Sequence, residues 1–180
     1  MISSERSQNI IVSLVIIAAM VSSVFLVGNA QYYGGSYVLV ENVEVSIADT
    51  VVSNIDPGNE SIYPRISFTF NFRTDSPTQG NVRLYSIEAS VTLNHDSLSL
   101  TVFNRYLTND PNQYLHPGYD TNFTVARTIN SIADRATVLQ ADNTSTWNWY
   151  IALTYSIITF NQRPFQRNLI LNWTGSTTVI

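Results

Sequence analysis

The sequence predicts a mainly β protein, an antiparallel seven-stranded β-sandwich with one short helix, preceded by an N-terminal transmembrane helix. Three observations support this prediction: an uncharged apolar run near the N-terminus, a period-two alternation of apolar and polar residues over much of the remaining chain, and turn-forming residues between the alternating segments. Without the apolar run, about 150 of the 180 residues remain, which is the usual size of one domain with its own core.

The composition excludes several classes of function. Only 12% of the residues are charged, Lys is absent and the net charge is −4, so the chain offers no basic surface for nucleic acid. Cys is also absent, which excludes disulfides, thiolate metal sites and Cys nucleophiles. The stability of the domain must therefore come from burial, for which the 12% of aromatic residues provide apolar area.

The apolar run from Ile10 to Val27 has 18 residues without a charge, close to the shortest helix that crosses a bilayer. Arg6 precedes the run and the next basic residue is Arg65, so the positive-inside rule places the N-terminus in the cytoplasm. We therefore expect a single-pass membrane protein that contacts the bilayer through this run. Its expected parts are a cytoplasmic tail (1–9), a signal-anchor helix (10–27), a stalk (28–36) and an extracytoplasmic domain (37–180).

A cleaved signal peptide is the alternative interpretation of this run. Gly28-Asn29-Ala30 has the small residues of a signal-peptidase site, and cleavage there would release a secreted domain that begins at Gln31. The run is longer than the roughly 7–15 residues of a signal-peptide core, which favours a retained anchor. In the stalk, Tyr32 and Tyr33 suit the headgroup region, and Gly34-Gly35 suits a flexible joint.

Alternation is clearest in residues 65–74 and 85–93, which are separated by a stretch dense in turn formers. We expect these two runs to be successive antiparallel strands. The apolar face of the first comprises Ile66, Phe68, Phe70 and Phe72. Further strands are expected within 37–52, at 98–103, around 123–125, at 147–160 and at 167–174. One stretch has helical spacing instead, through Ile129, Ile132, Ala133, Ala136, Leu139 and Gln140, with Asn130 or Ser131 as its cap.

No motif indicates an enzyme, and we assign no catalytic, cofactor-binding or metal site. His95 and His116 each stand beside turn residues, without a Gly-x-Ser-x-Gly elbow, and no Gly-x-Gly-x-x-Gly phosphate loop occurs. Side-chain oxygens of the kind that coordinate calcium occur in one expected loop region, at Asn109, Asp110, Asn112, Asp120 and Asn122. Their spacing does not match an EF-hand, and turn formation is the commoner role of such residues.

Four Asn-x-Ser/Thr sequons occur, at Asn59, Asn122, Asn143 and Asn172. Asn59 and Asn143 lie in expected loops, where a glycosyltransferase would reach them if the domain is extracytoplasmic.

The order of these features resembles the late-embryogenesis-abundant type 2 family, also called the water-stress and hypersensitive-response domain, over residues 37–175. The matching features are a strand ending near Ser46-Ile47, the strand Ile66 to Phe72, the turn Asp75-Ser76-Pro77, the run Leu84 to Val91, His116-Pro117-Gly118 before a strand and a helix, and two long closing strands. Ser76 stands where the family has the Asn of an Asn-Pro pair. The resemblance implies a fibronectin- or immunoglobulin-like sandwich without catalytic residues, and a stress-related or lipid-contacting role.

The sequence therefore predicts a non-enzymatic, membrane-anchored extracytoplasmic domain with an interaction or structural role and an unidentified protein or lipid partner. A pilin-like filament subunit, which self-assembles with its N-terminal helix in the fibre core, is the alternative. No basic-Gly processing site precedes Ile10, which counts against that alternative.

Overall fold

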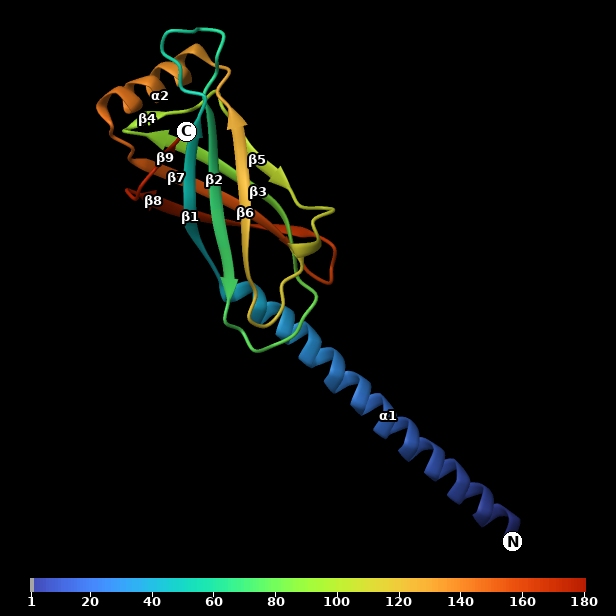
Figure 1. Cartoon of the computed structure of the whole chain (residues 1–180). Coiled ribbons are helices and arrows are strands. Elements are labelled where there is room, and N and C mark those ends of the chain that lie inside the picture. Colours follow the sequence, from blue (N-terminus) through green and yellow to red (C-terminus); the bar gives the residue numbers. More distant parts are fainter. Residues whose placement is uncertain (1) are drawn as a thin grey trace.

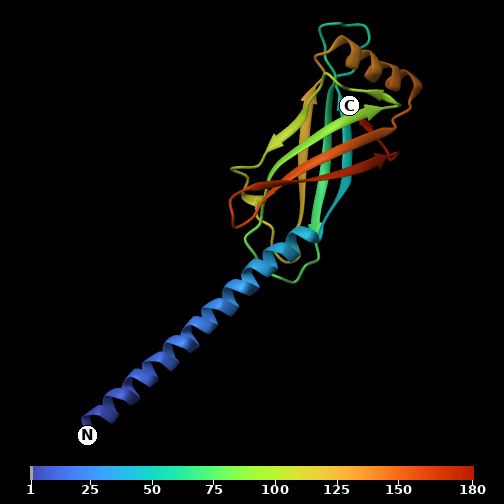
Figure 2. The ribbon, with the colours of Figure 1, turned by 180° about the vertical axis from the view of Figure 1, so that it is seen from behind.

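The computed structural model describes residues 2–180, with side chains from residue 4 onward. A single 40-residue helix, α1 (Ile2–Glu41), projects from one end of a body made of two β-sheets (Figures 1 and 2). This arrangement confirms the prediction of a mainly β chain preceded by a long apolar helix.

The first sheet has the strand order β6-β2-β1-β9. Its strands are β1 (Val43–Ser53), β2 (Arg65–Thr74), β6 (Asp120–Thr128) and β9 (Thr178–Val179). β2 pairs antiparallel with both β1 and β6, but β9 pairs parallel with β1 through Val51 and Val52. The prediction of purely antiparallel sheets was therefore wrong at this edge.

The second sheet has the order β4-β3-β7-β8, with β5 also paired to β3. Its strands are β3 (Arg83–Leu93), β4 (Asp96–Ser97), β5 (Phe103–Tyr106), β7 (Trp149–Ile158) and β8 (Pro164–Trp173). All of these pairs are antiparallel. β8 lies at the edge of the sheet and follows β7 as a long hairpin, as the sequence predicted.

The described residues form nine strands, where the sequence predicted seven. The two additional strands are the two-residue β4 and β9, and the strand expected at 98–103 begins only at its last residue. Leu98 is instead a buried anchor whose amide donates to the carbonyl of Val91, and the chain turns before β5 begins at Phe103. Alternation alone did not distinguish a buried turn residue from a strand residue in this short apolar stretch.

Aromatic side chains join the two sheets face to face. Phe68 of β2 lies 5.1 Å from the ring centroid of Trp149 on β7, and Phe72 lies 5.4 Å from Tyr155. All four side chains on the expected apolar face of β2 are fully buried: Ile66, Phe68, Phe70 and Phe72. The alternation in the sequence thus located the core correctly.

The predicted short helix is α2 (Ile132–Thr144), which lies at the end of the body opposite α1 (Figure 2). Ser131 is its N-cap, and its hydroxyl oxygen accepts from the amide of Asp134 at 3.3 Å. Ser145 ends the helix in the left-handed conformation, with φ 51°. A short 3-10 helix, η1 (Pro111–Gln113), precedes β6.

We expect Phe70→Asp to prevent folding and Thr69→Asp to be tolerated. Phe70 is fully buried, and removing its ring alone costs about 3–5 kcal/mol before the buried carboxylate is counted, against a total stability of about 5–15 kcal/mol. The Thr69 hydroxyl lies on the other face, 3.0 Å from that of Thr124, so its loss costs about 1 kcal/mol. Far-ultraviolet circular dichroism and thermal unfolding measure both variants; similar effects would contradict the assigned faces.

Candidate functional site

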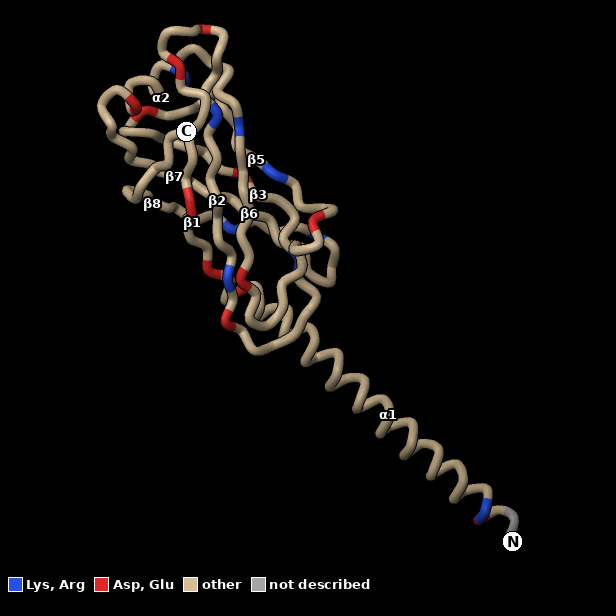
Figure 3. The backbone as a smooth tube through the Cα atoms, in the orientation of Figure 1, with Lys and Arg blue, Asp and Glu red and all other residues tan. Residues whose placement is uncertain are grey.

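The N-terminal part of α1 is an apolar helix in which every residue from Ser4 to Gly34 is exposed. The segment Ser4–Glu41 contains an 18-residue window whose mean hydropathy is 2.9, and no residue of that window is buried. Between Arg6 and Glu41 it carries no charge (Figure 3). A helix that is apolar on every side is stable where its surroundings are apolar as well, and this one has the length and composition to cross a membrane. A signal sequence has the same properties.

The C-terminal part of α1 is packed into the body by two glycines. At Gly35 the helix lies against the carbonyl of Gln79 in the β2–β3 loop, and a Cβ added at Gly35 would overlap that oxygen. From the other side, a Cβ at Gly80 would lie 2.5 Å from the Cα of Ser36. The two backbones approach this closely only because neither residue has a side chain.

Hydrogen bonds and burial hold the same junction. The fully buried hydroxyl of Ser36 accepts from the amide of Asn81 at 2.9 Å and donates to the carbonyl of Tyr32 at 2.9 Å. One turn later, Leu39 and Val40 belong to the hydrophobic core. The last two turns of α1 are therefore part of the folded body.

Two side-chain contacts extend the junction along the second sheet. The ring of Tyr33 lies 4.4 Å from that of Phe160, in the β7–β8 loop. Glu41, the last residue of α1, forms an ion pair with Arg167 of β8. The pair is half-exposed, so it orients the helix more than it stabilises the fold.

Residues 28–36, predicted as a stalk, are helical, so the flexible joint expected at Gly34-Gly35 was wrong. The first strand, expected within residues 37–52, is β1, and the chain already enters the body before it, in the last turns of α1. Gly35 serves for close approach, not for flexibility. The signal that was missed is the spacing of Gly35, Ser36, Leu39 and Val40, which puts small and apolar residues on one helical face.

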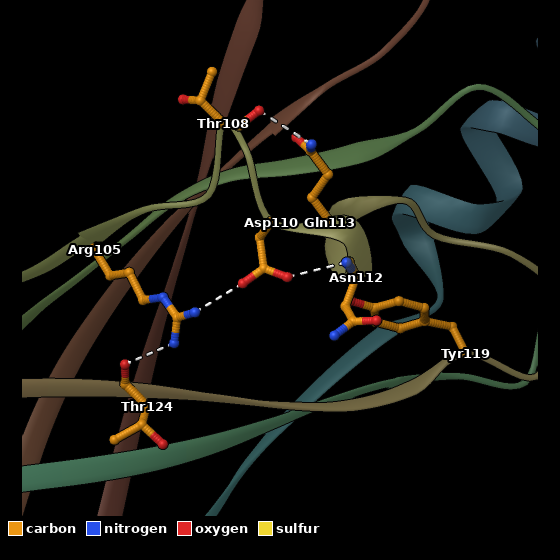
Figure 4. A network of polar contacts seen from close by, with 7 residues as sticks. All are labelled: Arg105, Thr108, Asp110, Asn112, Gln113, Tyr119 and Thr124. Carbon is orange, nitrogen blue, oxygen red and sulfur yellow. Dashed lines mark hydrogen bonds and ion pairs between the residues drawn. The ribbon is translucent and has the colours of Figure 1, made fainter.

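A polar network at the β5–β6 connection involves Asp110, one of the candidate calcium ligands (Figure 4). One carboxylate oxygen of Asp110 pairs with Arg105 at 2.7 Å, and the other accepts from the amide of Asn112 at 3.0 Å, where Asp110 caps η1. Arg105 also donates to the carbonyl of Thr124 on β6. The network ties the connection to the first sheet, which is a structural role.

Two further candidate ligands, Asp120 and Asn122, are engaged with β2. The side-chain amide of Asn71 on β2 donates to Asp120 at 2.6 Å and to Asn122 at 2.9 Å. Within residues 2–180, no three His, Cys, Asp or Glu residues are grouped so as to hold a metal ion.

Both histidines occupy exposed turns. His95 adopts φ 76° between β3 and β4. His116 has its Nδ1 atom 3.0 Å from the carbonyl oxygen of Pro117 and its ring against that of Tyr119. The structure thus places each histidine in local turn contacts.

All four sequon asparagines are exposed, but they occupy different elements. Asn59 lies in the β1–β2 loop, Asn122 on β6 and Asn172 on β8. Asn143, expected in a loop, lies in the last turn of α2, so that placement was wrong. Their use as glycosylation sites stays a prediction.

Comparisons with known proteins identify no family. No protein-family profile matches the chain, and no curated protein matches its sequence. Among solved structures, it is similar to a structural-genomics target protein (TM-score 0.46, 11% identity, covering 76% of this chain and 89% of that one). It is also similar to a protein from Bordetella pertussis, with a TM-score of 0.44 and 12% identity, covering 73% of this chain and 89% of that one. A protein from Archaeoglobus fulgidus has a TM-score of 0.38 and 11% identity, covering 74% of this chain and 95% of that one. Similarities at this level assign neither a fold family nor a function.

The adjacent glycines of α1 provide a matched test of the junction. We expect Gly35→Ala to destabilise the domain by about 1–3 kcal/mol through overpacking against Gln79. A Cβ at Gly34 meets nothing within 4 Å, so Gly34→Ala should gain up to about 1 kcal/mol of helix propensity. Amide hydrogen exchange at residues 36–41 in detergent-solubilised protein measures the effect. Equal protection in the two variants would show that the junction is not packed as described.

Alkaline pH should weaken the fold through Tyr119. Burial, and to a lesser extent the charge of Asp110, raise the pKa of Tyr119 to about 12. The folded state then holds the phenol proton more tightly than the unfolded chain, whose tyrosines ionise near pH 10. The contribution is complete below pH 10 and is lost as the pH rises through 12. Urea unfolding between pH 8 and 11.5 should show a shallower decline for Tyr119→Phe than for the unmodified chain; identical slopes would contradict the assignment.

Proposed function

We propose that this chain is a membrane-anchored extracytoplasmic protein whose β domain, held rigidly by α1, has a non-enzymatic interaction or structural role. The observation that carries the proposal is that α1 is one continuous helix, which is exposed and apolar over Ile10 to Val27 and belongs to the domain core at Leu39 and Val40.

The two parts of α1 support different halves of the proposal. Large apolar side chains such as Leu14, Val24 and Leu26 are more than half exposed, and burial in hydrocarbon removes this surface from water. The other end of α1 connects this span to the domain, because Gly35 and Ser36 pack against the β2–β3 loop. Arg6 before the span and no basic residue until Arg65 favour a domain outside the cytoplasm.

The finer identity of the domain belongs to the same proposal. Two sheets packed through aromatic residues are compatible with a fibronectin- or immunoglobulin-like sandwich and with the late-embryogenesis-abundant type 2 resemblance. The exposed positions of Asn59, Asn122, Asn143 and Asn172 are compatible with glycosylation of an extracytoplasmic domain. The chemistry of the partner is left open, as either protein or lipid.

Membrane extraction and intact mass test the proposal. We expect the native protein to resist alkaline carbonate, to dissolve in detergent and to have a mass that includes residues 1–30. The physical reason is that moving an 18-residue apolar helix from the bilayer into water exposes its apolar surface, which costs a large free energy. A soluble product whose mass corresponds to a start at Gln31 would reject the anchor and make the chain a secreted domain.

A pilin-like filament subunit is the second candidate, and the continuity of α1 from its exposed part into the core is the observation that favours it. A filament subunit needs a helix that connects the fibre core to its head, and α1 runs without a break from its exposed N-terminal part into the body (Figure 1). Negative-stain electron microscopy of material sheared from cells distinguishes the two candidates. Fibres containing this chain would favour the filament, whereas their absence together with a carbonate-resistant membrane fraction would favour the anchor.

A further inference from the structure

We propose that the β7–β8 loop (residues 159–163) rests on the phosphate-bearing headgroup layer of the membrane that α1 enters, so that the domain contacts the lipid surface at a second point. This inference rests on the proposed membrane anchoring and adds a specific lipid-facing surface to it.

The position of Tyr33 on α1 sets the depth of this loop. Tyr33 lies six residues beyond Val27, which corresponds to about 9 Å along a helix that rises 1.5 Å per residue. The interfacial layer on each side of a roughly 30 Å hydrocarbon core is about 5–8 Å thick. The backbone of Tyr33 therefore lies just beyond this interfacial layer. Its long side chain, which tilts towards the N-terminus of the helix, reaches back into the headgroup layer, where Tyr is enriched in membrane proteins.

Phe160 lies beside Tyr33, although it is 127 residues away in the sequence. The two ring centroids are 4.4 Å apart, so Phe160 is held at the level of Tyr33. Phe160 nonetheless leaves 45% of its surface exposed at the tip of a loop. When such an aromatic ring enters the membrane interface, lipid covers the apolar surface that the protein leaves exposed.

The charge of the loop suits the same surface. Residues 159–163 contain Arg163 and no carboxylate, and the side chain of Gln162 accepts from Arg83 at 3.3 Å, which brings a second guanidinium to the loop. Neither Arg83 nor Arg163 forms an ion pair within the described part of the chain. Guanidinium groups are well matched to phosphate oxygens.

The loop is also fixed in shape. The side-chain oxygen of Asn161 accepts from the amide of Arg163 at 3.0 Å and from the hydroxyl of Thr159 at 3.2 Å. Because α1 is locked to the body at Gly35 and Ser36, the loop does not move away from the bilayer independently of the anchor. A modest tilt of the helix towards this side brings Phe160 into the headgroup layer.

The test uses tryptophan fluorescence of the full-length chain in vesicles that contain phosphatidylglycerol and phosphatidylcholine, with or without a nitroxide on the phosphatidylcholine headgroup. In Phe160→Trp, we expect the nitroxide to reduce the emission of the new residue by about twofold or more, because the ring lies in the interface. The native residues provide a constant background, because Trp149 and Trp173 lie at the far ends of β7 and β8 and Trp147 lies just before β7.

Tyr63→Trp is the matched control, because Tyr63 is a partly exposed aromatic residue in the β1–β2 loop at the opposite end of the body (Figure 1). Its emission should not change with the headgroup nitroxide. The same result for Phe160→Trp, in protein that sediments with the vesicles, would overturn this inference and leave the anchor intact. Failure of the unmodified chain to sediment with vesicles would instead overturn the membrane proposal and this inference with it.

A second variant covers the case in which the larger ring disturbs the loop. The chain has no Cys, so Phe160→Cys provides a unique thiol for a spin label. We expect this label to be less accessible to a water-soluble nickel complex in vesicles than in detergent, and a label at Tyr63→Cys to be equally accessible in both. Equal accessibility at position 160 would overturn the inference.

Discussion

The close approach of α1 to the β2–β3 loop is the contact on which the functional geometry depends. Gly35 and Gly80 have no side chains at the point where the helix backbone meets the loop backbone, so the two backbones can approach closely. The hydroxyl of Ser36 forms two hydrogen bonds at the same point. Leu39 and Val40 then enter the core. The result is that the apolar helix continues without a break into the core of the β domain.

The packing of α1 against the domain determines which surfaces of the domain lie near the exposed part of the helix and which lie far from it. A flexible stalk would let the domain sample many orientations above a membrane, and no surface of it would have a defined distance from the bilayer. With a fixed helix, the β7–β8 loop stays near the anchor, whereas α2 and the β1–β2 loop stay at the far end (Figures 1 and 2). Under the proposed membrane anchoring, the far end is the part of the domain that lies farthest from the bilayer.

The polar groups of the domain are used mainly for structure. Asp110 pairs with Arg105 and caps η1, and Asp120 and Asn122 bond Asn71 across neighbouring strands. These are residue types that would bind calcium in another arrangement. Here their oxygens are engaged with side chains and amides of the fold, which is why the same composition is consistent with a structural role.

The sequence by itself determined the features that depend on local periodicity. The period-two alternation identified the buried face of β2 at Phe68, Phe70 and Phe72, and the spacing after Ser131 identified α2 and its cap. The uncharged run from Ile10 to Val27 identified the helix that could span a membrane. These features follow from the faces of single elements, which the order of residues encodes directly.

Only the tertiary structure decided how the elements meet. The parallel pairing of β9 with β1, the buried turn at Leu98 and the helical state of residues 28–36 all depend on contacts between distant segments. Gly34 and Gly35 show the physical reason: the sequence makes them equivalent, but Gly34 faces open space and Gly35 lies against the carbonyl of Gln79. A glycine has no side chain to indicate its neighbour, so whether it bends the chain or admits another backbone is set by packing alone.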